Sequence, residues 1–184
     1  MKKIIAILLC LVMLGGCASV AETAETESKP ILGTLGGYVI KYVAPEGYQL
    51  SIMHNDNNAI IGIALPDTAE KPTITLSIAF NDSYFGDDGQ GMRLNDISDE
   101  DMTLIRESFE DNTDVTSFED SETAFGTKVL IVKGSNGGKE YIDVYSIYNA
   151  YEVEAVITGE AGTLNDDYTR MIIDFFSDID FAAA

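Results

Sequence analysis

Outside its carboxylates, this sequence carries few residues that could do acid–base or nucleophilic chemistry. It has one histidine, His54, which lies in the polar stretch HNDNN. A Ser-His-Asp site needs a histidine held in a pocket by a carboxylate. The sequence also lacks the Gly-x-Ser-x-Gly elbow that presents a nucleophilic serine. We therefore interpret His54 as an exposed turn residue and predict that the chain is not an enzyme.

Metal binding is the next chemistry to consider. One histidine, with both cysteines inside the first 17 residues, excludes the usual zinc ligand sets. Calcium requires only oxygen ligands, and the polar loop Asn81–Asp96 is the best candidate through Asp82, Asp87 and Asp88. Its spacing is not that of an EF-hand, so we interpret it as a solvated acidic loop. A cation or small-ligand site in this 81–96 loop is an alternative function, and an unrecognised carboxylate enzyme site is another.

The richest glycine segment, Gly134–Gly138, lies between two lysines. It joins two predicted strands and does not lead into a helix, so it lacks the amide groups of a phosphate-binding loop. We predict a hairpin in which Asn136-Gly137 supplies the positive φ angles, and we expect no bound cofactor.

Four tyrosines could form a ligand surface, since tyrosine combines an apolar ring with a polar tip. Tyr141 and Tyr145 share one face of a predicted strand, and Tyr148 and Tyr151 flank a turn. We favour half-buried positions on a sheet for all four.

The first 17 residues have the layout of an export signal. Two lysines precede the apolar run Ile4–Leu14, which is too short to span a membrane. The run ends in Leu14-Gly15-Gly16-Cys17, which resembles the lipobox of bacterial lipoproteins. That resemblance implies removal of residues 1–16 and attachment of diacylglycerol, with palmitate-type chains, to Cys17. Two or three acyl chains on one residue would hold the protein stably on a membrane.

Composition limits the partners of this chain. It has 11 basic and 31 acidic residues, a net charge of −20. Such a charge repels nucleic acid and anionic lipid surfaces. We therefore expect the membrane to be contacted through the lipid anchor, on the extracytoplasmic side, with a protein of the cell envelope as partner and no nucleic acid.

The segment after Cys17 is rich in alanine, glutamate, threonine and serine and has no aromatic residue until Tyr38. It cannot bury a core. We expect a lipidated cysteine and flexible tether over residues 17–37, followed by one globular domain over residues 38–184.

The pattern from Tyr38 onward is mainly that of strands. Alternating apolar residues are clearest at Thr73–Phe80. A helix should begin after Ser98, whose hydroxyl can cap it, and end near Asp111. Further strands are predicted at 38–43, 48–53, 59–64, 115–120, 127–133, 140–148 and 152–158.

The last third of the chain is expected to close the fold. The strand over 127–133 is apolar on both faces, which predicts a central strand covered on both sides. A final helix should be capped by Thr163, and Ile179 and Phe181 should add an edge strand or pack down the tail. The fold class is α+β: an antiparallel sheet with one helix inserted mid-chain and one at the end.

This order of elements resembles the PsbP-like superfamily, which includes bacterial lipoproteins of the DcrB type. The resemblance rests on the turn Pro45-Glu46-Gly47-Tyr48, the mid-chain helix, the strand meander and the ending Phe175–Phe181. It implies an α/β/α sandwich and an accessory or binding role. Tyrosine stands at 48 where such domains often have tryptophan. Together, the leader and this resemblance predict a lipid-anchored accessory or binding protein without enzymatic activity.

Overall fold

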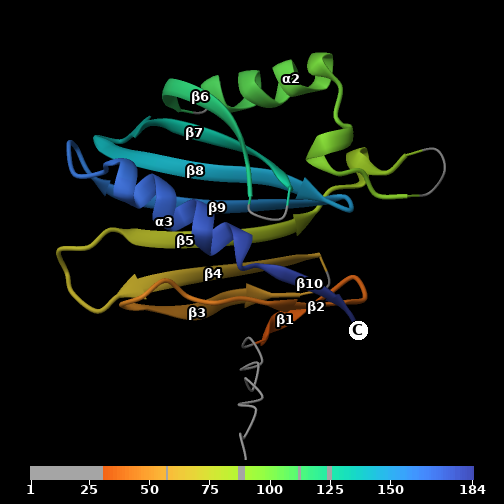
Figure 1. Ribbon diagram of the computed structural model, residues 1–184, viewed down its shortest axis with the longest axis horizontal. Helices are drawn as coiled ribbons and strands as arrows, with labels where there is room; N and C mark the ends of the chain where they lie inside the picture. Colours follow the sequence, from red (N-terminus) through yellow and green to blue (C-terminus); the bar gives the residue numbers. More distant parts are fainter. Residues whose placement is uncertain (1–30, 57, 87–89, 112, 124–125) are drawn as a thin grey trace, which may run out of the picture.

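The computed structural model describes residues 31–184, except 57, 87–89, 112 and 124–125. Cys17, Asp87 and Asp88 therefore lie outside the described residues. The fold is α+β, as predicted, and its main element is a seven-stranded antiparallel sheet in the order β3-β4-β5-β9-β8-β7-β6 (Figure 1). The strands are β3 (Tyr48–Asn55), β4 (Ala59–Pro66), β5 (Thr73–Phe80), β6 (Asp114–Glu122), β7 (Lys128–Asn136), β8 (Lys139–Tyr148) and β9 (Tyr151–Glu160).

A second, three-stranded sheet joins the two ends of the described chain. It consists of β1 (Ile31–Leu35), β2 (Tyr38–Lys41) and β10 (Asp180–Ala183), with β2 in the middle. The last strand confirms the closing edge strand predicted around Phe181. The start of structure at Tyr38 was wrong, because β1 lies inside the segment interpreted as tether. Gly36 and Gly37, at the end of that segment, adopt φ angles of 54° and 85° and form the tight turn between β1 and β2.

Two main helices accompany the sheets, α2 (Asp99–Glu110) and α3 (Asp166–Ser177), with short 3₁₀ turns η1 (Asp82–Tyr84) and η2 (Leu94–Asp96). The predicted cap of α2 is confirmed, because the Ser98 side chain accepts a hydrogen bond from the Asp101 amide at 3.1 Å. Helix α2 therefore begins after Ser98, as predicted, and it ends at Glu110, next to the predicted end near Asp111.

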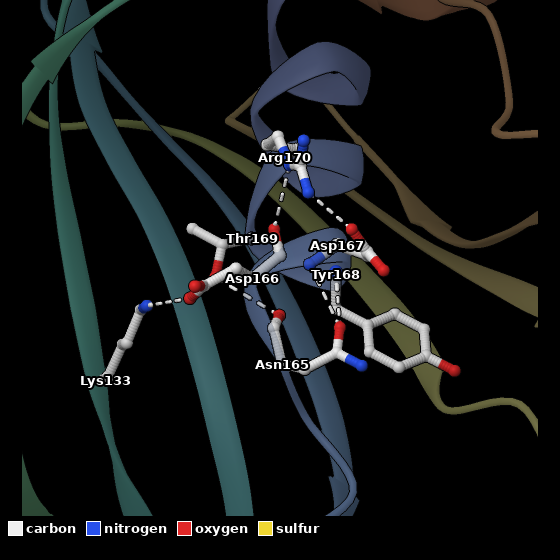
Figure 2. A network of polar contacts seen from close by, with 7 residues as sticks. All are labelled: Lys133, Asn165, Asp166, Asp167, Tyr168, Thr169 and Arg170. Carbon is white, nitrogen blue, oxygen red and sulfur yellow. Dashed lines mark hydrogen bonds and ion pairs between the residues drawn. The ribbon is translucent and has the colours of Figure 1, made fainter.

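The cap of α3 was predicted at the wrong residue. Asn165, not Thr163, caps it: its Oδ1 accepts from the amides of Asp167 and Tyr168 at 2.9 and 3.3 Å (Figure 2). Thr163 instead donates its hydroxyl to the Glu160 carbonyl at 2.6 Å. Threonine and asparagine both favour the cap position of a helix. The hydroxyl of Thr163 is instead bonded within the turn that follows β9.

The large sheet has a buried core on each face. Helix α3 and the small sheet cover one face, with Ile40, Leu76 and Phe175 among its buried residues. Helix α2 covers part of the other, where Met102 and Ile105 pack against β7 and β8. On that side, Leu65 of β4 is 48% exposed. The part of this face that α2 covers therefore does not extend as far as β4.

Strand β7 is covered on both faces, as predicted, because its alternate residues enter different cores. Val129 and Ile131 join the α3 side, and Leu130 and Val132 join the α2 side. Its predicted central position is wrong: β7 is next to the edge, and β9 is the middle strand. A strand that is apolar throughout indicates burial on both faces. The position of that strand in the sheet depends on pairing with strands that are distant in sequence.

Within the described part of the chain, neither α2 nor α3 is long and apolar enough to cross a membrane.

Candidate binding cleft beneath helix α2

The C-terminal half of α2 lies above two neighbouring cavities on the sheet, of about 270 and 350 Å³. Phe109 of α2 and Thr113, just beyond the helix, line both cavities. We call the two together the α2 cleft. Cavities of this size commonly hold small molecules, provided a few polar groups converge in them.

Asp143 of β8 is the unusual residue of the α2 cleft. It lines the 350 Å³ cavity, is only 5% exposed, and faces the α2 side of the sheet opposite Val156. Its Oδ1 atom is buried and has no hydrogen-bond partner among the described residues. Burial raises the pKa of this carboxyl well above its ordinary value, and the nearby charge of Glu154 raises it further.

Strand β9 brings two more acids to the same face. Alternation along the strand places Glu152 and Glu154 on the α2 side, and both line the 270 Å³ cavity. Burial raises the pKa of Glu154, and Glu152 adds to that rise. Glu154 pairs directly with Tyr145 of β8 and is therefore a diagonal neighbour of Asp143.

Tyrosine hydroxyls complete the polar lining. The Tyr145 hydroxyl donates to Glu152 Oε1 at 3.1 Å and lies 3.3 Å from the Tyr84 hydroxyl. Burial raises the pKa of Tyr145 far above its ordinary value, so this phenol stays protonated. On the other side, the hydroxyls of Tyr141 and Thr113 are 2.6 Å apart. The tyrosine hydroxyls therefore act as hydrogen-bonding groups that link residues lining the cleft.

Chemically, two buried acids of this kind can bind a cation or take part in acid–base chemistry. Enzymes that use two carboxylates set their pKa values apart, so that one is a proton donor while the other is ionised. Here burial raises the pKa of both Asp143 and Glu154. A positively charged ligand would supply the charge partner that neither acid has among the described residues.

The prediction that the four tyrosines lie on a sheet is confirmed. Three of them are more deeply buried than the half-buried state that we expected. Tyr141, Tyr145 and Tyr151 are 8%, 3% and 6% exposed, and Tyr148 is half-buried. The sequence reading missed Asp143 and Glu154. A signal was present, because Asp143 stands at an inward position of a strand whose neighbours on that face are the buried Tyr141 and Tyr145.

The predicted cation loop, Asn81–Asp96, has a structural role in its described part. Asp82 is exposed in η1, and no group of three potential metal ligands occurs among the described residues. The loop instead holds the turn between β8 and β9. The Asn81 amide donates to the Ala150 carbonyl at 2.9 Å, and the Ala150 amide donates to the Met92 carbonyl at 3.0 Å. These bonds support a positive φ of 66° at Ala150, which is unusual for alanine.

His54 is exposed, as predicted, although it lies at the end of β3 and not in a turn. Its Nε2 is 2.9 Å from Asp56 Oδ2, and both side chains are half exposed. Backbone amides of Asn58 and Ala59, and then His54, lower the pKa of Asp56. His54 lines none of the cavities described here, so this pair belongs to the surface turn.

The glycine-rich segment forms the predicted hairpin, with a shift of one residue. Gly137 and Gly138 take the two positive φ angles, 61° and 85°, and Asn136 pairs with Lys139 as the last residue of β7. Two adjacent glycines adopt this turn more easily than asparagine and glycine, so the predicted Asn136-Gly137 turn was wrong.

Another cavity, of about 370 Å³, lies on the opposite face between the end of α3 and β10. Its lining is apolar, with Tyr148, Phe176 and Phe181, and includes several hydroxyls. Those of Ser146 and Ser177 already donate to the carbonyls of Lys128 and Ile173. None of its described lining residues has a buried polar side-chain atom without a partner, as Asp143 has, so the α2 cleft is the better candidate site.

No protein-family model matches this chain. No curated protein matches it significantly either. The α2 cleft must therefore be interpreted from its own chemistry.

Proposed function

We propose that this chain is a lipid-anchored, extracytoplasmic binding protein without enzymatic activity, and that the α2 cleft holds its ligand. One observation carries the binding role: the carboxyl oxygen Oδ1 of Asp143 is buried beside a cavity and has no hydrogen-bond partner in the part of the chain that the structure describes. Buried polar groups almost always have hydrogen-bond partners, because leaving one unpaired costs about 1–3 kcal/mol. A ligand in the cavity would provide the missing partner.

The anchor and the family remain proposals that rest on the sequence. The lipobox-like Leu14-Gly15-Gly16-Cys17 supports attachment at Cys17. A helix on each side of one antiparallel sheet is consistent with a PsbP-like sandwich and supports that part of the proposal.

The anchor is tested by substituting Cys17 in the full-length chain. We expect the wild-type protein to label with a palmitate analogue and to sediment with membranes. The variant Cys17→Ser should lose both properties. Equal labelling and sedimentation of the two proteins would contradict lipid attachment at Cys17.

Ligand binding is tested by a thermal-shift screen of small metabolites against the full-length protein and its Asp143→Asn variant. We expect at least one compound to raise the melting temperature of the wild type and to lose most of that effect in the variant. A screen without such a compound would contradict binding in the α2 cleft.

Pull-down from membranes, with the wild type and the Cys17→Ser variant, tests for an envelope protein partner.

A carboxylate enzyme is the second candidate, and the pair Asp143 and Glu154 is the observation that favours it. The two functions differ in the fate of the ligand. A binding protein returns the compound unchanged after prolonged incubation, as mass spectrometry would detect, whereas an enzyme converts it.

The calcium alternative for the loop Asn81–Asp96 predicts a higher melting temperature in millimolar calcium. An unchanged melting temperature would contradict this alternative.

A further inference from the structure

We propose that the ligand of the α2 cleft is a small aliphatic diamine, with one ammonium group at Asp143 and the other at Glu154 and Glu152. This inference rests on the proposed function and names the ligand class of the same site. Three observations support it: the unpartnered acid, the second acidic position next to it, and the apolar surface between them.

The first ammonium position is set by Asp143. Its buried Oδ1 can accept a hydrogen bond that no described group of the protein donates. The neighbouring Thr113 and Tyr141 hydroxyls are already bonded to each other at 2.6 Å. An N–H donor with a positive charge is the partner that best offsets the desolvation of a carboxylate.

The second ammonium position is in the adjoining cavity, where Glu152 and Glu154 line the wall. Glu154 is diagonal to Asp143 across β8 and β9, and such positions are about 7–8 Å apart at the backbone. A short aliphatic chain can link two charges over a distance of this order. A diamine therefore matches two acidic positions in neighbouring cavities better than a monoamine does.

The surface between the acids suits methylene groups. Phe109 lines both cavities, and its ring packs edge-on to Tyr145 with centroids 5.7 Å apart. Tyr141 and Val156 line the Asp143 side. Aromatic faces also attract organic cations, and the C-terminal end of α2, above the cleft, carries partial negative charge.

Other ligand classes fit less well. A calcium ion needs six to eight oxygen ligands, and no group of three potential metal ligands was found in the described residues. An anion would face three acids. Lys139 is the one basic side chain among the described lining residues, and its Nζ is 3.7 Å from Glu160 Oε1.

Binding of a diamine should also release protons. The titratable groups around Asp143 are Glu152 and Glu154 of β9, Tyr141 and Tyr145 of β8, Tyr84 of η1, and Lys139 at the hairpin. Helix α2 contributes Ile105, Ser108 and Phe109 to the described lining, and none of these is charged. Since the carboxyl of Asp143 holds its proton more tightly than usual, an arriving ammonium group would displace that proton. Affinity should therefore rise with pH until Asp143 is ionised in the free protein.

The test is isothermal titration calorimetry of the full-length protein, purified in a non-ionic detergent, with putrescine as probe. We expect saturable binding, with n-butylamine at least tenfold weaker. The heats should differ between phosphate and HEPES buffers because protons are released. The variants Asp143→Asn and Glu154→Gln should each lower affinity at least tenfold. The matched control Asp174→Asn removes an exposed acid of α3 on the other face and should leave affinity unchanged.

Three results would overturn the inference: no putrescine binding at millimolar concentration, equal affinity for butylamine, or an equal loss of affinity in Asp174→Asn. Circular dichroism spectra of all variants show whether each is folded. If the thermal-shift screen yields a compound of other chemistry that Asp143→Asn no longer binds, the diamine inference fails while the binding function stands. If no compound depends on Asp143, both fail.

Discussion

Replacing Asp143 by asparagine should change how the stability of the free protein depends on pH. The substitution keeps the size of the side chain and removes its ionisation. It breaks no described hydrogen bond to Oδ1, since no described residue is a partner of this buried atom. The folded protein raises the pKa of Asp143 through burial and the charge of Glu154. The folded state therefore binds this proton more tightly than the unfolded state does.

The sign and size of the effect follow from proton linkage. At a pH between the unfolded and folded pKa values, the folded state holds more protons, so the free energy of unfolding falls as pH rises. For one group the slope is at most about 1.4 kcal/mol per pH unit. The loss begins near the unfolded value of about 3.9 and stops at the folded pKa. Asp143→Asn lacks this loss and should become progressively more stable than the wild type over that window.

Urea unfolding followed by circular dichroism, at each pH unit from 4 to 8, measures this difference. We expect the two proteins to be close in stability near pH 4 and to diverge as pH rises. Asp174→Asn, at an exposed site, should run parallel to the wild type. Because the charge of Glu154 contributes to the raised pKa of Asp143, Glu154→Gln should also reduce the slope. A pH-independent difference between wild type and Asp143→Asn would refute a raised pKa at this carboxyl.

Four further substitutions test other parts of the fold, each by chemical unfolding. Gly37→Ala should cost about 1 kcal/mol through its φ of 85° alone. Gly36→Ala should cost clearly more, because its Cβ would also meet the Tyr151 hydroxyl at 1.6 Å; equal costs would contradict that close approach. Ser98→Ala should lose about 1 kcal/mol with the cap of α2, and an unchanged midpoint would argue against the cap. Phe181→Ala should cost about 2 kcal/mol, since its half-buried ring stacks in an aromatic cluster. It should also speed amide exchange in β10, and unchanged exchange there would show that the ring does not hold this strand.

Elements dominated by local signals were predicted closely. The alternation in Thr73–Phe80 gave strand β5 with its exact bounds, and Ser98 gave the start of α2. Local competition caused two of the errors. Two residues close in sequence suited the same cap at Thr163 and Asn165, and the same turn at Asn136 and Gly138. Where two such residues have similar propensities, the surrounding hydrogen bonds decide which of them forms the cap or the turn.

The sequence by itself was enough to predict the α+β class, both helices and the burial of β7 on two faces. These features follow from hydrophobic periodicity and from capping residues, which act over a few positions. It also carries every argument for the anchor at Cys17, which lies outside the described residues.

Only the tertiary structure decided which carboxylates meet. Asp143 and Glu154 are separated by a turn, and each is an ordinary acid in its own strand. The antiparallel register of β8 and β9 makes them diagonal neighbours, and Phe109 of α2 lines the cavity beside the buried Asp143. Desolvation depends on the elements packed above a residue and not on its neighbours in sequence. The chemistry proposed for this protein therefore appears only where the sheet and α2 come together.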